Sequence, residues 1–315
     1  MNPRLLGGIA AGVAALAAVG LFADTYLLRL ATTFAMYCAL GLSWNLVGGY
    51  TGYPSFATAA FFGLGAYATA IAQTSGLPLP LAWATGGLVP FLFAGLLGLA
   101  ILHLRGHYFA IASLVVADVL REVTNSWTSL TGGGMGLNLP LVGGSVAAQA
   151  QFYFWVMVGL ALIALGITVA VDRSRLGVAV RCIAQNEDAA QIIGIDTRRA
   201  KVAAFALSGL LAGAAGGVYA SWVTYIDPSD VYDVSLSVKP ILMALLGGAG
   251  TVMGPVVGAF VFLASEELLW RNLLSFHAGL LGLLVVALVL FLPDGLKSIR
   301  WRGIIAPRAA PGTRS

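Results

Sequence analysis

The sequence predicts an all-α, polytopic integral membrane protein. Of its 315 residues, 59% are hydrophobic and only 10% are charged, whereas soluble domains carry roughly 25% charged residues. The mean hydropathy of +0.91 is a membrane value, and apolar segments of membrane-spanning length recur along the chain. The pI near 9.2 does not indicate nucleic-acid binding, because the basic residues lie in the loops that flank these segments.

Each predicted span is a run of about 20 mostly apolar residues, which is long enough to cross a bilayer as a helix. The first run, 5–23, is longer than the apolar core of a signal peptide and lacks a clean small-x-small cleavage site. A retained helix is therefore favoured over a cleaved leader. The other runs are 30–48, 54–74, 81–102, 108–126, 151–171, 202–222, 239–268 and 277–293.

Basic residues predict how these spans are oriented. Segment 172–201, hereafter the island, holds six of the seventeen Lys and Arg residues, and the tail 297–315 is also basic. Both are expected in the cytoplasm, because cytoplasmic loops carry an excess of Lys and Arg. Loops 127–150 and 223–238 contain neither residue type and should face outward, which places the N-terminus inside as well.

The run 239–268 raises a problem of parity, because two cytoplasmic segments are separated by an even number of crossings. Residues 247–255 read GGAGTVMGP, and Gly and Pro at that density break a helix. Two short spans or a re-entrant pair of half-helices would restore parity. We expect eight full spans plus this broken pair, or ten in total, with residues 1–296 forming the transmembrane domain and 297–315 a cytoplasmic tail.

Two Gly-rich breaks in the chain resemble each other. Residues 48–54 read GGYTGYP and echo 247–255, and paired interruptions in two halves of a protein can mark a transport site. Gly-rich sequence is also common in membrane helices, so the repeat stays an open alternative. The path residues, predicted because they supply polar atoms or exposed backbone at irregular points, are Asn45, Tyr50, Thr51, Thr131, Gly247, Gly248 and Gly250.

The island contains a short motif. Residues 188–194, DAAQIIG, have the acidic-Ala-Ala-x-x-x-Gly spacing that occurs in permease subunits of ABC importers. Small residues let a short helix enter a partner's cleft, and a Gly ends the helix and lets the chain turn. The alternative is a solvated amphipathic helix that contacts only lipid headgroups. The docking residues predicted for an ATPase partner are Arg181, Glu187, Asp188, Ala189, Ala190 and Gly194.

Stretches across residues 30–295 resemble, in order and spacing, the branched-chain amino acid permease family of ABC importers, in particular its LivM-type subunit. They are LSWNLVGGYTG (42–52), AAFFGLGAY (59–67), GHYFAIA (106–112), LTGGGMGL (130–137), RLGVAVR (175–181), NEDAA (186–190) with Gly194, and LGGAGTVMGP (246–255). Tyr53-Pro54 and Gly134-Met135 depart from the family's commoner residues. Permeases for urea and short-chain amides are close relatives and remain an alternative.

The resemblance implies a mechanism and a set of partners. Two homologous permease subunits would form the path for branched-chain or other hydrophobic amino acids in a bacterial inner membrane. Two ATP-binding cassette subunits would hydrolyse Mg-ATP, and an extracytoplasmic binding protein would deliver the substrate. The chain has no Gly-x-x-x-x-Gly-Lys-Ser/Thr loop, so we expect it to bind no nucleotide and to be non-catalytic. Energy would arrive through contacts at the island that differ between ATP-bound and ATP-free states.

Ionisable residues inside the spans offer a rival function. Asp118, Arg121 and Glu122 share a helix face, and the favoured interpretation is an ion pair that fixes helix packing. A transporter driven by an ion gradient would need midplane acids, and only Asp118 is a candidate. A membrane enzyme or scaffold lacks support, because the sequence shows no nucleophile–base pair. His103 and His107 flank a helix-breaking Gly106 and are expected at the membrane interface rather than on a metal.

Overall fold

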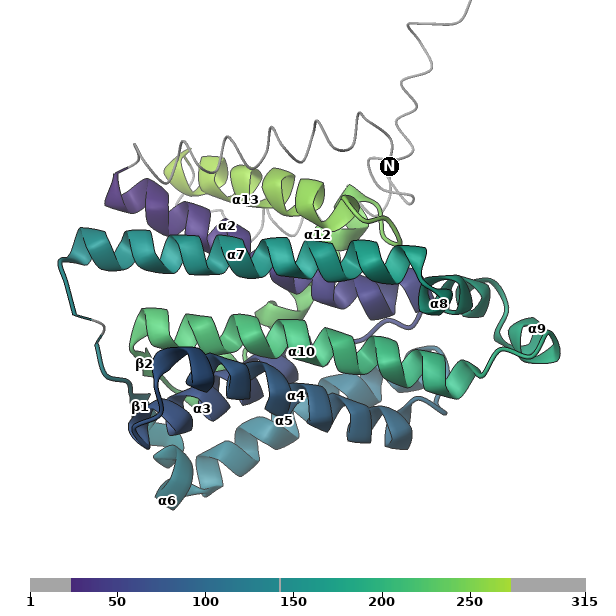
Figure 1. Ribbon diagram of the computed structural model, residues 1–315, viewed down its shortest axis with the longest axis horizontal. Helices are drawn as coiled ribbons and strands as arrows, with labels where there is room; N and C mark the ends of the chain where they lie inside the picture. Colours follow the sequence, from purple (N-terminus) through teal and green to yellow (C-terminus); the bar gives the residue numbers. More distant parts are fainter. Residues whose placement is uncertain (1–23, 142, 273–315) are drawn as a thin grey trace, which may run out of the picture.

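The computed structural model describes residues 24–141 and 143–272, and these residues form a bundle of long helices (Figure 1). The predicted spans 5–23 and 277–293 and the basic tail lie outside the described residues. Within the described ranges, four helices are long and apolar enough to cross a membrane. They are α2 (Thr25–Trp44) with its continuation η1 (Asn45–Gly49), α4 (Leu79–Ile101), α7 (Val146–Arg173) and α10 (Thr197–Val223).

Two further helices form where spans are predicted. They are α3 (Thr58–Thr74), which is short at 17 residues, and α5 (His107–Ser126), which carries the charged residues Asp118, Arg121 and Glu122. Helices therefore occupy all the predicted span positions from 30 to 222, although the number of membrane crossings stays a prediction.

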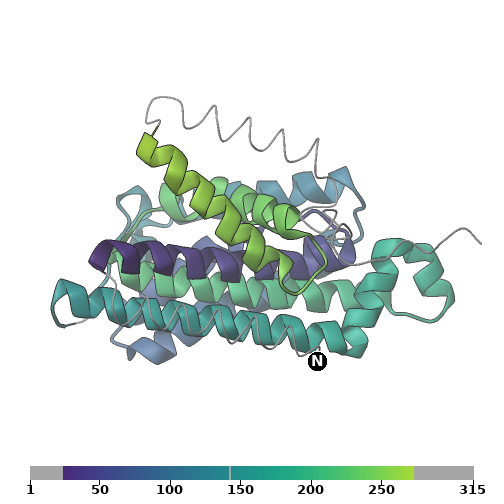
Figure 2. The ribbon, with the colours of Figure 1, turned by 90° about the horizontal axis from the view of Figure 1, so that it is seen from above.

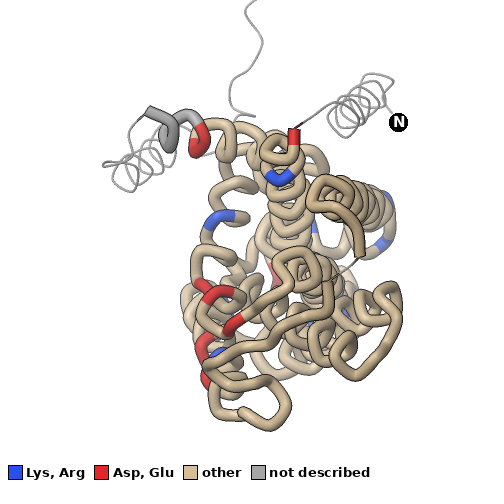
Figure 3. The backbone as a smooth tube through the Cα atoms, turned by 90° about the vertical axis from the view of Figure 1, so that its left-hand side faces the viewer, with Lys and Arg blue, Asp and Glu red and all other residues tan. Residues whose placement is uncertain are grey.

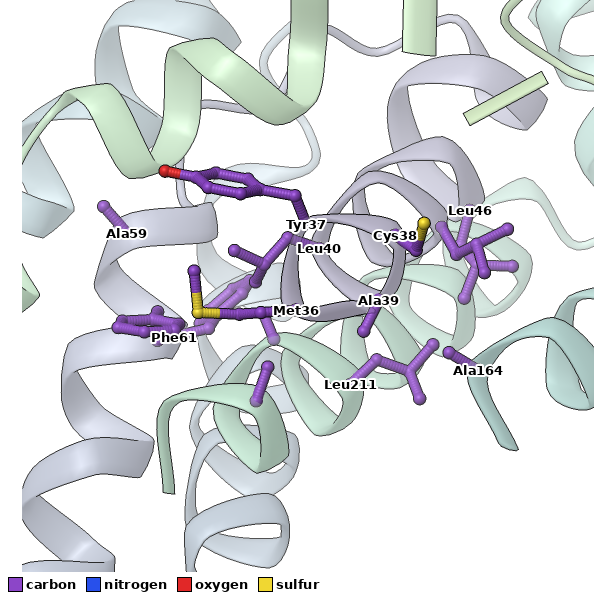
Figure 4. Packing of buried hydrophobic residues seen from close by; sticks show 14 of the residues in the cluster. Met36, Tyr37, Cys38, Ala39, Leu40, Leu46, Ala59, Phe61, Ala164 and Leu211 are labelled. Carbon is purple, nitrogen blue, oxygen red and sulfur yellow. The ribbon is translucent and has the colours of Figure 1, made fainter. Parts of the chain in front are cut away.

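Helix α2 lies at the centre of the bundle. Its residues from Ala35 to Trp44 are all buried, because α7, α10 and the C-terminal helices surround it (Figures 1 and 2). Figure 4 shows Met36, Tyr37 and Leu40 of α2 among side chains from three other helices. The residues that those helices contribute include Phe61 of α3, Ala164 of α7 and Leu211 of α10.

Helix α10 packs closely on α3 and α4 through small residues. A Cβ atom added at Gly213 would lie 2.6 Å from the carbonyl oxygen of Gly86 in α4, and one at Gly216 would lie 2.0 Å from that of Phe62 in α3. Backbones this close leave no room for a side chain. Small residues at such contacts are the usual means by which membrane helices approach each other closely.

The predicted break in 239–268 is confirmed. Helix α12 (Ser235–Gly247) ends at the Gly-rich stretch, and α13 (Gly254–Asn272) returns beside it as a hairpin. At 13 residues α12 is about 20 Å long, which is shorter than the roughly 30 Å hydrocarbon core. A Cβ atom at Gly258 would lie 1.7 Å from the Met243 carbonyl oxygen, so only glycine permits this packing.

The bundle has two chemically different ends. At the strand end, β1 (Leu137–Asn138) pairs antiparallel with β2 (Tyr225–Ile226), in the register Leu137↔Ile226, beside the short α6 (Thr128–Thr131), η2 (Gly133–Met135) and α11 (Pro228–Val231). This small ladder joins the two loops that lack Lys and Arg and is a departure from the all-α prediction. Figure 3 looks onto this end and shows acidic residues grouped along one side.

At the opposite, island end, α8 (Arg175–Gln185) and α9 (Glu187–Ile192) extend beyond the bundle (Figures 1 and 2). Three polar side chains begin the helices here. The Ser174, Asn186 and Asp196 oxygens accept hydrogen bonds from the backbone N–H groups of Gly177, Ala189 and Arg199 and so cap α8, α9 and α10.

Candidate functional site

The candidate site is α9 together with the turn that follows it. Gly194 adopts a left-handed φ of +88°, and the Ile195 N–H donates back to the Ala190 carbonyl oxygen at 3.0 Å. A residue with a Cβ atom would be strained at this φ, so Gly194 is the residue that ends the helix sharply. The helix and its glycine turn form as the island motif predicts.

A buried lysine fixes α9 to the bundle. Lys201 of α10 is only 5% exposed, and its Nζ donates to Glu187 Oε1 at 2.7 Å, to the Tyr53 hydroxyl at 3.0 Å and to the Leu102 carbonyl oxygen at 2.8 Å. The Tyr53 hydroxyl in turn donates to the other oxygen of Glu187. We call Lys201, Glu187 and Tyr53, with the Leu102 carbonyl, the Lys201 network.

The Lys201 network joins four parts of the chain. Glu187 begins α9, Lys201 lies on α10, Tyr53 belongs to the segment between η1 and α3, and Leu102 follows α4. The ammonium group also lies 4.5 Å from the centroid of the Tyr53 ring, a cation–π distance. The three hydrogen bonds of the Lys201 network use all three donor positions of the ammonium and connect α9 directly to these segments.

Electrostatics keep both acids of α9 ionised. Burial by itself raises the pKa of Glu187, but the hydrogen bonds from Lys201 and Tyr53 and the charges of Lys201 and Arg105 outweigh it and hold that pKa below its ordinary value. Next to it, Asp188 accepts a 2.8 Å bond from Arg105 in the α4–α5 loop, and this hydrogen bond lowers the pKa of Asp188. Two carboxylates thus tie the start of α9 to its own chain.

The six predicted docking residues do not all face outward. Glu187 pairs with the buried Lys201 and Ala190 is only 2% exposed, so both face the bundle, whereas Asp188 pairs with Arg105 at the surface. Arg181 pairs with Asp172, and its guanidinium lies 5.3 Å from the ring centroid of Tyr50. Arg181, Asp188, Ala189 and Gly194 are all exposed.

Two residues that the sequence prediction omitted dominate the exposed side of α9. Ile192 is 86% exposed and Ile193 is 70% exposed, although both lie in the most polar segment of the chain. We call Ala189, Ile192, Ile193 and Gly194 the α9 surface. Consecutive isoleucines at the end of a charged helix were the available signal, because apolar side chains that project into water at a helix tip indicate a contact surface.

The predicted path residues at the two Gly-rich breaks contact other segments of the same chain. Asn45 begins η1, and its side chain donates to the Thr251 carbonyl oxygen at 2.9 Å and accepts from the Gly250 N–H at 2.8 Å. The two Gly-rich breaks that resemble each other in sequence therefore meet, and a Cβ atom at Gly49 would lie 2.6 Å from the Gly250 nitrogen. A Cβ atom at Gly247 would lie 1.7 Å from the Gly254 carbonyl oxygen, and Gly248 follows the last residue of α12 as its C-cap.

The remaining path residues also use their polar atoms within the chain. The Tyr50 hydroxyl donates to Asp172 at 3.0 Å, and the Thr51 hydroxyl donates to the Val47 carbonyl oxygen at 2.7 Å. Thr131 lies at the strand end, where its hydroxyl donates to the Thr124 carbonyl oxygen at 2.6 Å. All three side chains are buried, so in the described part of the chain they stabilise irregular backbone, and a role in lining the path stays a prediction.

Comparison with known proteins places the chain in a family. The sequence model of the family described as "Branched-chain amino acid transport system / permease component" matches residues 26–292, which is most of the chain. The chain belongs to this family. The resemblance that the sequence motifs predict is thereby confirmed, and the chain is a multi-pass transport permease subunit.

Individual relatives of this permease have names of both LivM and LivH type. The high-affinity branched-chain amino acid transport system permease protein LivM of Escherichia coli (strain K12) is 28% identical over 294 residues, covering 85% of this chain and 69% of the relative. LivH of Salmonella typhimurium is 24% identical over 287 residues, covering 84% and 92%. The probable LivM of Methanocaldococcus jannaschii is 21% identical, covering 87% and 93%. No solved structure matches the permease significantly.

Replacing Asn45 of the permease with alanine is expected to lower its stability by about 2 kcal/mol. The change removes two hydrogen bonds and leaves the Gly250 N–H and the Thr251 carbonyl without the partner that Asn45 supplies in the interior. Thermal unfolding of the purified permease in detergent measures the loss. Thr33→Ala is the control, because the Thr33 hydroxyl makes an exposed bond to its own helix. Equal melting temperatures for both variants would contradict this role for Asn45.

Proposed function

We propose that this permease is the LivM-type membrane subunit of an ATP-driven importer of branched-chain and other hydrophobic amino acids. The family match and the names of its relatives support this substrate class. A homologous second permease subunit completes the path, since relatives of both LivM and LivH type match over more than four-fifths of the chain. An extracytoplasmic binding protein delivers the substrate, and two ATP-binding cassette subunits bind and hydrolyse Mg-ATP.

The observation that carries the proposal is the α9 surface. Its isoleucines project from a polar end of the bundle, while the Lys201 network holds the same helix rigidly on its inner side. A helix that only rested on lipid headgroups would not need a buried ion pair beneath it. An ATPase that binds the α9 surface moves Glu187, and through it the segments of Tyr53 and Leu102.

The charge of the island end predicts the orientation of the permease in the membrane. The island carries six Lys and Arg residues, so α8 and α9 lie in the cytoplasm, where ATP is available. The strand end then faces the opposite side of a bacterial inner membrane and receives the substrate from the binding protein. Both termini are cytoplasmic in this arrangement.

Uptake in proteoliposomes tests the function. The permease is reconstituted with its homologous partner, both ATPase subunits and the binding protein, and uptake of labelled leucine is followed with and without internal ATP. We expect uptake only with ATP and only with the binding protein. Uptake driven by a proton or sodium gradient in the absence of ATPase subunits would refute the proposal. Labelled urea and acetamide, tested in parallel, identify the alternative substrates.

A further inference from the structure

Helix α5 presents two contrasting faces. Its inner face, Phe109, Ser113, Ala117 and Thr124, is buried against the bundle. The opposite side, which we call the α5 outer face, is exposed in the chain. It consists of Ile111, Val115, Asp118, Val119, Glu122 and Val123.

Charged groups lie midway along the α5 outer face. Asp118 follows the first residue of α5 by 11 positions in a helix of 20 residues, which places it about 17 Å along a helix of about 30 Å. Its carboxylate lies 3.5 Å from the Arg121 guanidinium, and both side chains are about half exposed. The predicted ion pair therefore forms, but it points away from the bundle and cannot fix helix packing within this chain.

Contact with lipid hydrocarbon would be unfavourable for the α5 outer face. A charge at the middle of a bilayer is costly when it contacts hydrocarbon, and intramembrane charges face a partner or a water-filled cavity. The neighbouring helix α4 has the composition expected of a lipid-facing surface, because Leu88, Leu92 and Leu96 are exposed and α4 contains no charged residue. The two helices thus present chemically different surfaces at the same depth.

The α5 outer face is also hollowed toward the strand end. A shallow, open hollow of about 580 Å³ is lined by Val119, Glu122, Val123, Ser126 and Trp127, all from the C-terminal part of α5 and the residue after it. It begins at the end of the bundle where the two loops without Lys and Arg lie and continues to the level of the ion pair. Its lining combines apolar side chains with a carboxylate, as a path for a small amphipathic solute requires.

We propose that the α5 outer face lines the water-filled translocation path, opposite the homologous second permease subunit. This inference rests on the proposed function and assigns its path to a surface that the predicted path residues do not include. Asp118, Arg121 and Glu122 keep water along the path, while Val115 and Val119 contact the apolar part of the passing solute.

Cysteine accessibility in the assembled transporter tests this assignment. Cys38 and Cys182 are first replaced with alanine, and single cysteines are then introduced as Val115→Cys, Val119→Cys, Leu88→Cys and Leu92→Cys. Val119 is 53% exposed and lies 12 residues after the start of α5, and Leu88 is 54% exposed and lies 13 residues before the end of α4. The two positions therefore match in exposure and in distance from the loop that joins α4 to α5. Val115 and Leu92, at 49% and 56%, form a second matched pair.

A charged, membrane-impermeant thiosulfonate reagent is added to the intact complex in vesicles. We expect the α5 cysteines to react at least about tenfold faster than their α4 counterparts, because only thiols in contact with water ionise and react with such a reagent. Equal, slow rates at all four positions would place the α5 outer face in lipid and overturn the inference. The readout requires no transport, so failure here is distinct from failure of ATP-driven uptake.

Discussion

Replacing Lys201 with methionine is expected to lower the free energy of unfolding by about 3 kcal/mol, because removing one member of a buried ion pair leaves the other charge uncompensated. Glu187 would lose its closest cation, and the Tyr53 hydroxyl and Leu102 carbonyl would lose their shared donor. Thermal unfolding in detergent measures the stability. Co-purification of the ATPase subunits measures docking, which we expect to be lost as α9 detaches.

Two further variants separate the ion pair from a general effect of losing a lysine. Lys239→Met breaks the 2.8 Å pair with Glu266 between α12 and α13, where the lysine is more exposed, so the loss should be smaller. The double variant Lys201→Met, Glu187→Leu replaces the buried pair with apolar side chains and should recover most of the stability. If the Lys201→Met variant has the same melting temperature as the unsubstituted permease, the Lys201 network does not hold α9.

The double variant Ile192→Asp, Ile193→Asp is expected to abolish ATPase association and uptake while the permease stays folded. Burial of each isoleucine in a partner contributes about 1.5–3 kcal/mol. Losing both therefore weakens docking at least about 100-fold, since each 1.4 kcal/mol is tenfold in affinity. Folding is unaffected because both side chains are exposed in the free chain. Pull-down with the ATPase subunits and leucine uptake give the two readouts.

Three control variants show whether the effect of the isoleucine double variant is specific to the α9 surface. Met135→Asp changes an 85% exposed apolar residue at the strand end and should leave docking intact. Ala189→Arg places a charge on the same α9 surface and should also prevent docking. Ala190→Arg forces a charge into the interior and should destabilise the permease itself. Retained association of the isoleucine variant would refute the assignment of the α9 surface.

Local sequence was enough to predict much of the fold. The break at 247–255 follows from the density of Gly and Pro within a single stretch, and the turn after α9 follows from Gly194. Helix positions follow from long apolar runs. Each of these features depends on residues that are neighbours in the chain, which is the range over which patterns of single residues carry information.

The Lys201 network lay beyond that range. Tyr53 and Lys201 are 148 residues apart, and no periodicity marks a lysine that will be buried. The six residues of α9 are too few to show which side faces the bundle, so the sequence does not indicate that Ala190 is buried while Ile192 and Ile193 are exposed. Asn45 was predicted for its polar atoms, but its partner lies 205 residues away in the other Gly-rich break.

Helix α5 shows the same limit in another form. The i, i+3 spacing of Asp118 and Arg121 predicts their ion pair, which forms at 3.5 Å. Whether the pair faces the bundle or the outside depends on how α3 and the strand end pack on α5, and those contacts come from distant parts of the chain. Only the folded arrangement shows that the charged face is turned outward.

Photo-crosslinking from the α9 surface tests most directly the claim that ATPases drive this permease through α9. A photoreactive amino acid replaces Ile192, or Met135 as the control, and the assembled transporter is irradiated in membranes. The α9 surface predicts a covalent adduct between position 192 and an ATPase subunit, with a yield that changes when ATP is added, and no such adduct from position 135. If the ATPase subunits co-purify with the permease but position 192 gives no adduct with them, energy enters the permease elsewhere.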